Sequence, residues 1–207
     1  MDPKEREEVK TFKVPYSLGD INLQTKILAK SNKEDTKKAI LSDAFRAHST
    51  GNIEAAEKYY KSFLDKNFRD PKVLSNFGTI CQQKGEISKA IELYKQSIKF
   101  FPDSPEAYCN LGNILGDTGE IKKAEINTRK AIEMKSDYVE AYSNLSSILK
   151  KLGKLNEAKL SALKAISINN NFAMAHNNLA IIQKDLGNLE EAELSIRECI
   201  KINPNLA

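Results

Sequence analysis

Residues 107–137 have the sequence AYCNLGNILGDTGEIKKAEINTRKAIEMKSD, in which apolar residues recur at helical spacing in two separate halves. The recurring apolar residues are Tyr108, Leu111, Ile114 and Leu115 in the first half, and Ile121, Ala124 and Ile132 in the second. Gly119 lies between the halves, where a helix that ends in a left-handed residue needs glycine because a Cβ is costly in that conformation. The segment therefore predicts two amphipathic helices joined by a tight turn.

The turn glycine recurs every 34 residues along the chain. Its copies are Gly51, Gly85, Gly119, Gly153 and Gly187, and an alanine follows each after five residues, at Ala56, Ala90, Ala124, Ala158 and Ala192. A fixed period of this length marks repeat architectures, in which each unit is one supersecondary structure. We therefore divide residues 37–207 into five helix-turn-helix repeats: repeat 1 (37–70), repeat 2 (71–104), repeat 3 (105–138), repeat 4 (139–172) and repeat 5 (173–206).

Two further columns of residues with the same period explain how such repeats would pack. Small residues lie seven positions before each turn glycine and allow the two helices of a repeat to approach closely: Ala44, Gly78, Gly112, Ser146 and Ala180. Large apolar residues form a column in the second helices: Leu64, Ile98, Ile132, Ile166 and Ile200. One helix pair cannot bury that column alone, so we expect the repeats to stack on one another.

The repeats resemble tetratricopeptide repeats, which are helix-turn-helix units of 34 residues, over roughly Lys37 to Leu206. In repeat 3 the family's characteristic positions fall on Tyr108, Leu111, Gly112, Leu115, Gly119 and Ala124. The family's closing proline is present as Pro102 and Pro204, whereas Phe68, Ser136 and Asn170 replace it elsewhere. The resemblance implies an all-α fold, a right-handed helical solenoid of five repeats.

Both ends of the array depart from the repeat pattern. Residues 1–36 carry scattered charge and no sustained period, which predicts a polar, mobile leader. Repeat 1 has Asp43 and Arg46 at positions that are apolar in later repeats, as expected of a terminal repeat with one face in water. Repeat 5 is followed by no capping helix, so we expect exposed apolar surface around Leu194 and Ile202. That surface predicts a homodimer through repeat 5, coverage by a partner, or a chain that belongs to something longer.

Composition and charge disfavour several classes of function. The 207 residues carry 32 Lys+Arg against 28 Asp+Glu, and a net charge of +4 is too small and too evenly spread for a nucleic-acid binding surface. The sequence has no apolar run of about 18 residues, and its first ten residues are charged, so we expect neither membrane insertion nor export. These features predict a cytoplasmic protein.

The sequence contains no recognisable catalytic, metal or cofactor motif. Cys81, Cys109 and Cys199 are too far apart for a zinc site, and their odd number fits no disulfide framework. Cys81 and Cys199 fall on packing positions, whereas Cys109 is predicted to face a groove as an accessible thiol. His176 takes the position of a packed aromatic residue. We therefore expect no enzymatic activity, no metal and no cofactor.

One column of polar residues lies between the packing positions of the first helices: Asn76, Asn110, Asn144 and Asn178, hereafter the asparagine column. Helix propensity does not explain it, because asparagine competes for backbone hydrogen bonds. Under the tetratricopeptide resemblance this column lines the concave groove, and it is similar to the asparagines of the O-linked N-acetylglucosamine transferase repeats, which hold the backbone of an extended peptide. Asn113 and Asn177 join it by register. The alternative is that repeat duplication copied asparagines that bond only water or adjacent turns.

The leading functional hypothesis is a non-enzymatic scaffold that binds a peptide or partner protein in this groove. Chaperone-tail binders of the family use a clamp lysine, and Glu106, Glu140 and Met174 stand at that position here, which disfavours such a role. Two rivals remain. One is the substrate-recognition arm of a longer transferase, since the Lys-, Asn- and Ile-rich repeats also resemble bacterial multi-repeat proteins whose arrays often precede a transferase domain. The other is a self-associating assembly factor.

Overall fold

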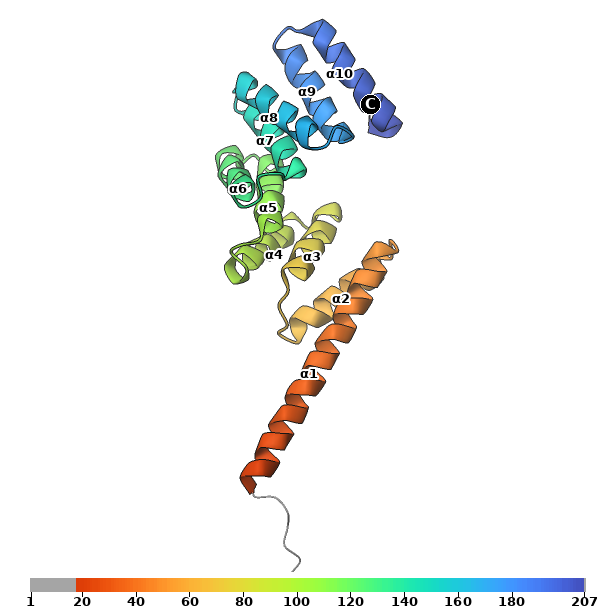
Figure 1. Ribbon diagram of the computed structural model, residues 1–207, viewed down its shortest axis with the longest axis vertical. Coiled ribbons are helices and arrows are strands. Elements are labelled where there is room, and N and C mark those ends of the chain that lie inside the picture. The colour runs from red at the N-terminus through yellow and green to blue at the C-terminus, as the bar shows by residue number, and fades with distance from the viewer. Residues whose placement is uncertain (1–17, 207) are drawn as a thin grey trace, which may run out of the picture.

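The computed structural model describes residues 18–206, and within them it is built from α-helices and one short 3₁₀ turn (Figure 1). The elements are α1 (Leu18–Ser49), α2 (Ile53–Asp65), α3 (Pro71–Gln83), α4 (Ile87–Phe100), α5 (Pro105–Asp117), α6 (Ile121–Met134), α7 (Val139–Lys151), α8 (Leu155–Ile168), α9 (Ala173–Asp185), α10 (Leu189–Ile202) and η1 (Pro204–Leu206). No strand occurs among the described residues. The all-α fold class expected from the sequence is confirmed.

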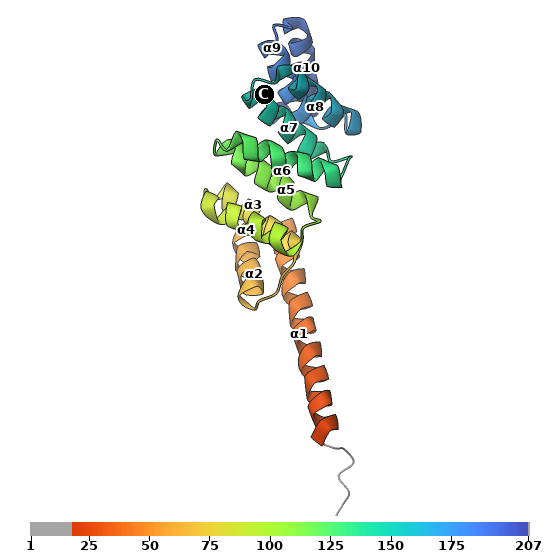
Figure 2. The ribbon, with the colours of Figure 1, turned by 90° about the vertical axis from the view of Figure 1, so that its left-hand side faces the viewer.

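Consecutive helices pack in pairs, and each pair packs on the next one along the long axis of the molecule (Figures 1 and 2). The first helices of neighbouring repeats also touch one another, so that α3 contacts α5, α5 contacts α7 and α7 contacts α9. The first helices therefore form a continuous wall along one side of a helical solenoid.

The turn glycines adopt the left-handed conformation that the sequence predicted. Their φ angles lie between +74° at Gly51 and Gly153 and +88° at Gly119. Within the repeats, the small residues have a different role. A Cβ built on Gly78 would lie 2.5 Å from Cε1 of Tyr94, and one on Gly112 would collide with Oγ1 of Thr128. The prediction that small residues allow close helix approach is confirmed at both positions.

The hydrophobic core changes in character along the solenoid. A large cluster around Tyr60, Phe63 and Tyr94 runs from repeat 1 through repeats 2 and 3 and ends at Ile148 in repeat 4. A smaller cluster, which includes Leu149 and Ile182, joins repeats 4 and 5. The aromatic residues are thus concentrated toward the N-terminal end.

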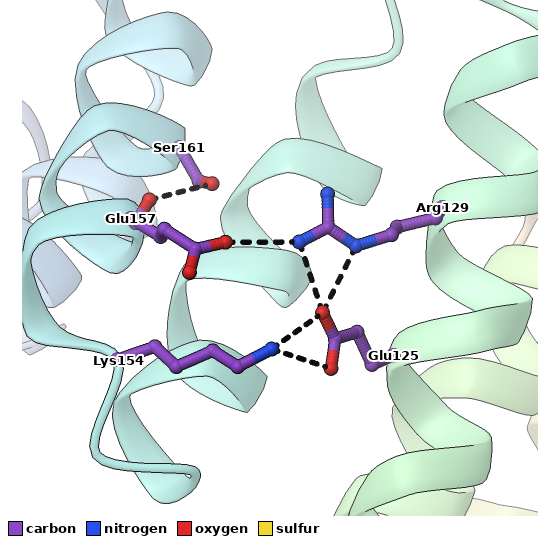
Figure 3. Close-up of polar contacts among 5 residues, drawn as sticks. All are labelled: Glu125, Arg129, Lys154, Glu157 and Ser161. Carbon is purple, nitrogen blue, oxygen red and sulfur yellow. Dashed lines mark hydrogen bonds and ion pairs between the residues drawn. The ribbon is translucent and has the colours of Figure 1, made fainter.

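Polar contacts connect neighbouring second helices on the outer side. Glu125 on α6 accepts hydrogen bonds from Arg129, at 3.0 Å to Nε, and from Lys154 Nζ at 3.2 Å, and Arg129 also bonds Glu157 at 3.2 Å (Figure 3). Lys159 similarly bonds Glu191, at 2.8 Å. These contacts join repeat 3 to repeat 4 and repeat 4 to repeat 5.

Residues 18–36 differ from the predicted mobile leader, because they form the first half of helix α1. This half extends beyond α2 as a rod (Figures 1 and 2), and the side chains of residues 30–36 are exposed. The segment contains many good helix formers and no proline, but its apolar residues keep no sustained helical period. A search for periodic apolar residues therefore could not find it. Residues 1–17 of the predicted leader lie outside the described part of the chain.

The expected exposure around the last repeat is only partly correct. Leu194 is 63% exposed, but Ile126 and Leu160, its counterparts in repeats 3 and 4, are 69% and 67% exposed. The exposure of Leu194 thus belongs to its position on the outer side, and Ile202 is half-buried. The real difference is Ile200, which is 41% exposed, whereas Ile166 in repeat 4 is half-buried against the next pair. Across residues 18–206, we find no helix with the length and apolar content needed to cross a bilayer.

Candidate functional site

The wall of first helices carries a groove of about 800 Å³ along repeats 3 to 5. Its floor and sides include Asn110, Asn113, Asn144 and Asn178. A smaller hollow of about 280 Å³ lies beside it at repeats 2 and 3, and Asn76 and Asn110 both line it. Because Asn110 and Tyr138 line both spaces, the larger groove and the smaller hollow are neighbours on one face.

The structure therefore brings together the whole asparagine column and Asn113. Each of these residues is half-buried on a first helix. Asn177 is also half-buried, but it lines neither the larger groove nor the smaller hollow in the described part of the chain. Its counterparts one and two repeats earlier, Ser143 and Cys109, do line the larger groove, so Asn177 differs from them because it belongs to the last first helix, α9.

Most of the asparagine column also connects one repeat to the previous one through the amide Nδ2. Asn144 donates to Cys109 Sγ at 3.4 Å, and Asn76 donates to the Tyr60 hydroxyl at 3.2 Å. Asn178 makes the most extensive set, with the Ser143 carbonyl at 3.0 Å, the Ser143 hydroxyl at 3.1 Å and the Ser146 hydroxyl at 3.3 Å. A packing role, which the sequence left open as the alternative, thus accounts for part of the recurrence.

These contacts use the amide nitrogens and leave the amide oxygens without a hydrogen-bond partner in the described part of the protein. Within residues 30–205, no protein group donates a hydrogen bond to Oδ1 of Asn76, Asn144 or Asn178. A carboxamide has both donors and an acceptor, so these three residues present acceptors to the groove.

Asn110 is different, because neither end of its carboxamide has a hydrogen-bond partner in the described protein. Asn144 and Asn178 each bond the residue that lies 35 positions earlier in the sequence, and the same spacing from Asn110 leads to Ser75. The hydroxyl of Ser75 is buried and also has no partner. The bond that joins the later repeats is therefore not made between repeats 2 and 3.

Two carboxylates stand at the groove. Glu106 and Glu140 occupy the first turns of α5 and α7, and they line the smaller hollow and the larger groove respectively. Glu106 accepts a hydrogen bond from the Ser104 hydroxyl at 3.3 Å, and neither glutamate has an ion-pair partner among the described residues. The nearby cations are Lys72, which lines the smaller hollow, and Lys135, whose Nζ lies 4.8 Å from the Tyr138 ring centre.

The groove centre is an acidic and poorly solvated environment. Burial raises the pKa of the Cys109 thiol to about 11, hydrogen bonds with Asn144 and Tyr138 oppose that rise, and the charges of Glu140 and Glu106 add to it. Burial likewise raises the pKa of Tyr138, with further contributions from Cys109, Glu106 and Glu140. The negative charges of both carboxylates therefore influence the same two groups of the groove, the Cys109 thiol and the Tyr138 hydroxyl.

The cysteine and histidine predictions have different outcomes. Cys109 is buried, so the prediction of an accessible thiol is wrong: the thiol forms part of the groove floor beneath Asn144. Cys81 and Cys199 are buried as packing residues, and His176 is packed with Nε2 2.9 Å from the Asn170 carbonyl, as predicted. In the described chain, His, Cys, Asp and Glu side chains form no group of three that could hold a metal ion.

Sequence reasoning missed the contribution of the repeat junctions. Ser104, Tyr138 and Phe172 precede the first helices of repeats 3, 4 and 5, and each lines the larger groove or the smaller hollow. They are spaced by 34 residues, but their residue types differ, so the periodicity of residue types gave no signal at the junctions.

Comparison with known families and structures agrees with this architecture. A family model described as "TPR repeat" matches residues 78–119, and one described as "Tetratricopeptide repeat" matches residues 105–138, 139–172 and 173–206. The chain belongs to the tetratricopeptide repeat family. Membership identifies it in general terms as a protein-interaction scaffold. No curated protein sequence matches the chain.

Several solved structures share the fold at low sequence identity. The crystal structure of MamA protein is 22% identical, with a TM-score of 0.65 over 83% of this chain and 94% of that one. TTC0263, a thermophilic TPR protein in Thermus thermophilus, is 18% identical, with a TM-score of 0.69 over 82% and 93%. MamA 41-end from Desulfovibrio magneticus RS-1 is 17% identical, with a TM-score of 0.68 over 83% and 97%. At these identities the likeness concerns the fold alone.

Proposed function

We propose that this chain binds an extended segment of a partner protein in the larger groove and the smaller hollow. The observation that carries the proposal is the asparagine column, which presents carboxamide groups once per repeat along one wall. An extended peptide has unpaired backbone N–H and C=O groups along its whole length, and a recurring row of carboxamides can pair with them without reading the side chains.

The groove favours a backbone ligand over a small molecule. Its polar groups are spread along three successive first helices, α5, α7 and α9, and do not converge on one point. Small-molecule sites usually combine an apolar pocket with a few convergent polar groups. The arrangement here matches a ligand that runs along the solenoid.

A random peptide library displayed on phage tests the proposal, with the purified chain as bait. We expect enrichment of peptides that bind the wild type and that lose at least tenfold in affinity for Ser147→Arg, which places a long cation in the larger groove. Ser167→Arg is the matched control, because Ser167 is exposed on α8 and lies outside the groove. Failure to enrich any peptide, or equal affinity for both variants, would overturn the proposal.

Self-association through repeat 5 is a second candidate, and the observation that favours it is the exposure of Ile200. We expect light-scattering mass to rise with concentration if α10 meets a second copy, and we expect Ile200→Lys to abolish that rise. A mass that stays monomeric across the dilution series would eliminate this candidate.

A further inference from the structure

The asparagine column is not uniform, and its exception lies where the larger groove and the smaller hollow meet. Asn76, Asn144 and Asn178 each have their amide nitrogen bonded to the preceding repeat. Asn110 has both its nitrogen and its oxygen without a partner in the described protein, and it alone of the column lines both spaces. Asn110 therefore offers a ligand its oxygen and both of its N–H donors, whereas Asn76 and Asn144 each have one N–H donor already in use.

A second polar group beside Asn110 also lacks a partner. Ser75 is only 6% exposed, lines the smaller hollow together with Asn110, and has a buried hydroxyl with no hydrogen bond. An unsatisfied buried hydroxyl costs free energy, and native proteins keep few of them. Asn110 and Ser75 together leave the smaller hollow with hydrogen-bonding capacity that the protein does not use.

The charged residues around Asn110 favour a ligand side chain that is positively charged. Four residues at the same register of successive first helices are Lys72, Glu106, Glu140 and Met174. The two central ones are exposed carboxylates without an ion-pair partner in the described chain, and no lysine or arginine of that part lines the larger groove. The cations near these two carboxylates are Lys72, which lines the smaller hollow, and Lys135, which lies over the Tyr138 ring. Neither forms an ion pair with Glu106 or Glu140 in the described chain.

The repeat 5 end of the larger groove carries apolar side chains beside Asn171, Asn178 and Asn203. Met174 is exposed there, and Phe172 and Ile202 line the same part. The order along the solenoid is therefore a cation, two carboxylates and then a group of apolar side chains. This order distinguishes the ends of a bound segment.

Resting on the proposed function, we infer that Asn110 anchors the main chain of an extended peptide that carries a lysine or arginine for Glu106 and Glu140. The peptide's next large apolar side chain, toward repeat 5, contacts Phe172 and Met174. A charged donor on a carboxylate makes a stronger hydrogen bond than a neutral one, so the basic residue supplies the selectivity and Asn110 supplies the orientation.

Three random peptide pools that differ only in one central residue, fixed as lysine, glutamate or alanine, test this inference. Binding of each pool to the purified chain is measured by fluorescence polarisation. We expect the lysine pool to bind about tenfold more tightly than the glutamate pool. The variant with both Glu106→Gln and Glu140→Gln removes the difference, and Glu140→Lys reverses it. The matched control is Glu190→Gln, because Glu190 is an exposed glutamate in the first turn of α10, outside the groove.

Asn110→Ala is expected to weaken all three pools equally, because a main-chain anchor does not read the central side chain. Equal binding of the pools, combined with loss of binding in Ser147→Arg, would overturn this inference and leave the proposed function intact. Absence of binding in every pool would overturn both. A lysine preference that survives the double glutamine variant would also overturn the role of the carboxylates.

Discussion

In repeat 2 the two helices meet at Gly78 and Tyr94, whereas the same two positions in repeat 4 hold Ser146 and Ala162. Tyr94, Ser146 and Ala162 are all fully buried. Where the second helix carries a large ring, the first helix has no side chain, and where the second helix carries a methyl group, the first helix has a hydroxymethyl group. In both repeats one small partner lets the helices approach closely, but the pair in repeat 2 is much the larger, because a tyrosine side chain far exceeds those of serine and alanine.

The two repeats also differ in how they join their neighbours. The Ser146 hydroxyl of repeat 4 receives the Asn178 amide, so repeat 5 is tied to repeat 4 by hydrogen bonds. Gly78 offers no hydroxyl to Asn110, and repeat 3 rests on repeat 2 without the corresponding bond. The larger apolar cluster lies toward the N-terminal end, and hydrogen bonds from Asn144 and Asn178 join the later repeats. The unused polar groups of Asn110 and Ser75 lie between these regions, where repeat 3 packs on repeat 2.

Removal of the ring in repeat 2 should have the largest effect on stability. Tyr94→Ala creates a cavity and deletes the hydroxyl contacts with Thr79 and Gln82, and truncations of buried aromatic residues typically cost about 3–5 kcal/mol. Urea denaturation measures this loss. Leu160→Ala on α8 is the control, because its exposed side chain should change the free energy of unfolding by less than about 0.5 kcal/mol. Similar losses for both variants would contradict the comparison.

Gly78→Ala tests whether the ring is the reason for the glycine. The added Cβ would lie 2.5 Å from Cε1 of the buried Tyr94, and such overpacking typically costs about 1–3 kcal/mol. In the Tyr94→Ala background the same change should stabilise the helix, because alanine is favoured over glycine by about 1 kcal/mol there. A double-mutant cycle measured by urea denaturation gives the coupling. An equal effect in both backgrounds would show that the two residues are independent.

The asparagines of repeats 3 and 5 should respond differently to the same truncation. Asn178→Ala removes three hydrogen bonds to repeat 4 and should lower the free energy of unfolding by about 1 kcal/mol or somewhat more. Asn110→Ala removes none that the structure contains and replaces asparagine by a better helix former, so its thermal midpoint should be unchanged or slightly raised. Calorimetry on both variants checks the order, and a larger loss at Asn110 would disprove the assignment.

The outer-side contacts should contribute least. Glu125→Gln weakens the bonds from Arg129 and Lys154 (Figure 3), and pairs near the surface are typically worth about 0.2–1 kcal/mol. Burial raises the pKa of Glu125, but the bonds from Arg129 and Lys154 outweigh it and leave the pKa below the ordinary value. The stabilisation is therefore present above the ordinary carboxyl pKa and is lost as the pH falls through the lowered one. Thermal melts at several pH values check this, and a wild-type advantage that grows in acid would contradict it.

The repeat period predicted the helices, the turns and the wall that carries the asparagines, because each of these depends on residue type at a fixed spacing. It could not predict which asparagine is free. Asn110 with Ser75 and Asn178 with Ser143 are the same pair of residue types at the same separation, yet only the second pair is bonded. Whether the hydrogen bond forms depends on the exact packing of one repeat on the next. Small differences in sequence, such as Gly78 in repeat 2 and Ser146 in repeat 4, change that packing. The first half of α1 escaped prediction for a different reason, since its apolar residues keep no sustained helical period.

The five turn glycines provide a way to ask how cooperatively the solenoid unfolds. A Cβ on any of them would meet nothing within 4 Å, so replacement by L-alanine would add the conformational cost of a left-handed residue, about 1–2 kcal/mol, without a steric clash. The same strain can thus be applied separately at Gly51, Gly85, Gly119, Gly153 or Gly187. If the chain unfolds as one unit, the five variants will lose the same stability. If repeats unzip from an end, as nearest-neighbour stacking allows, the loss will depend on which turn is strained.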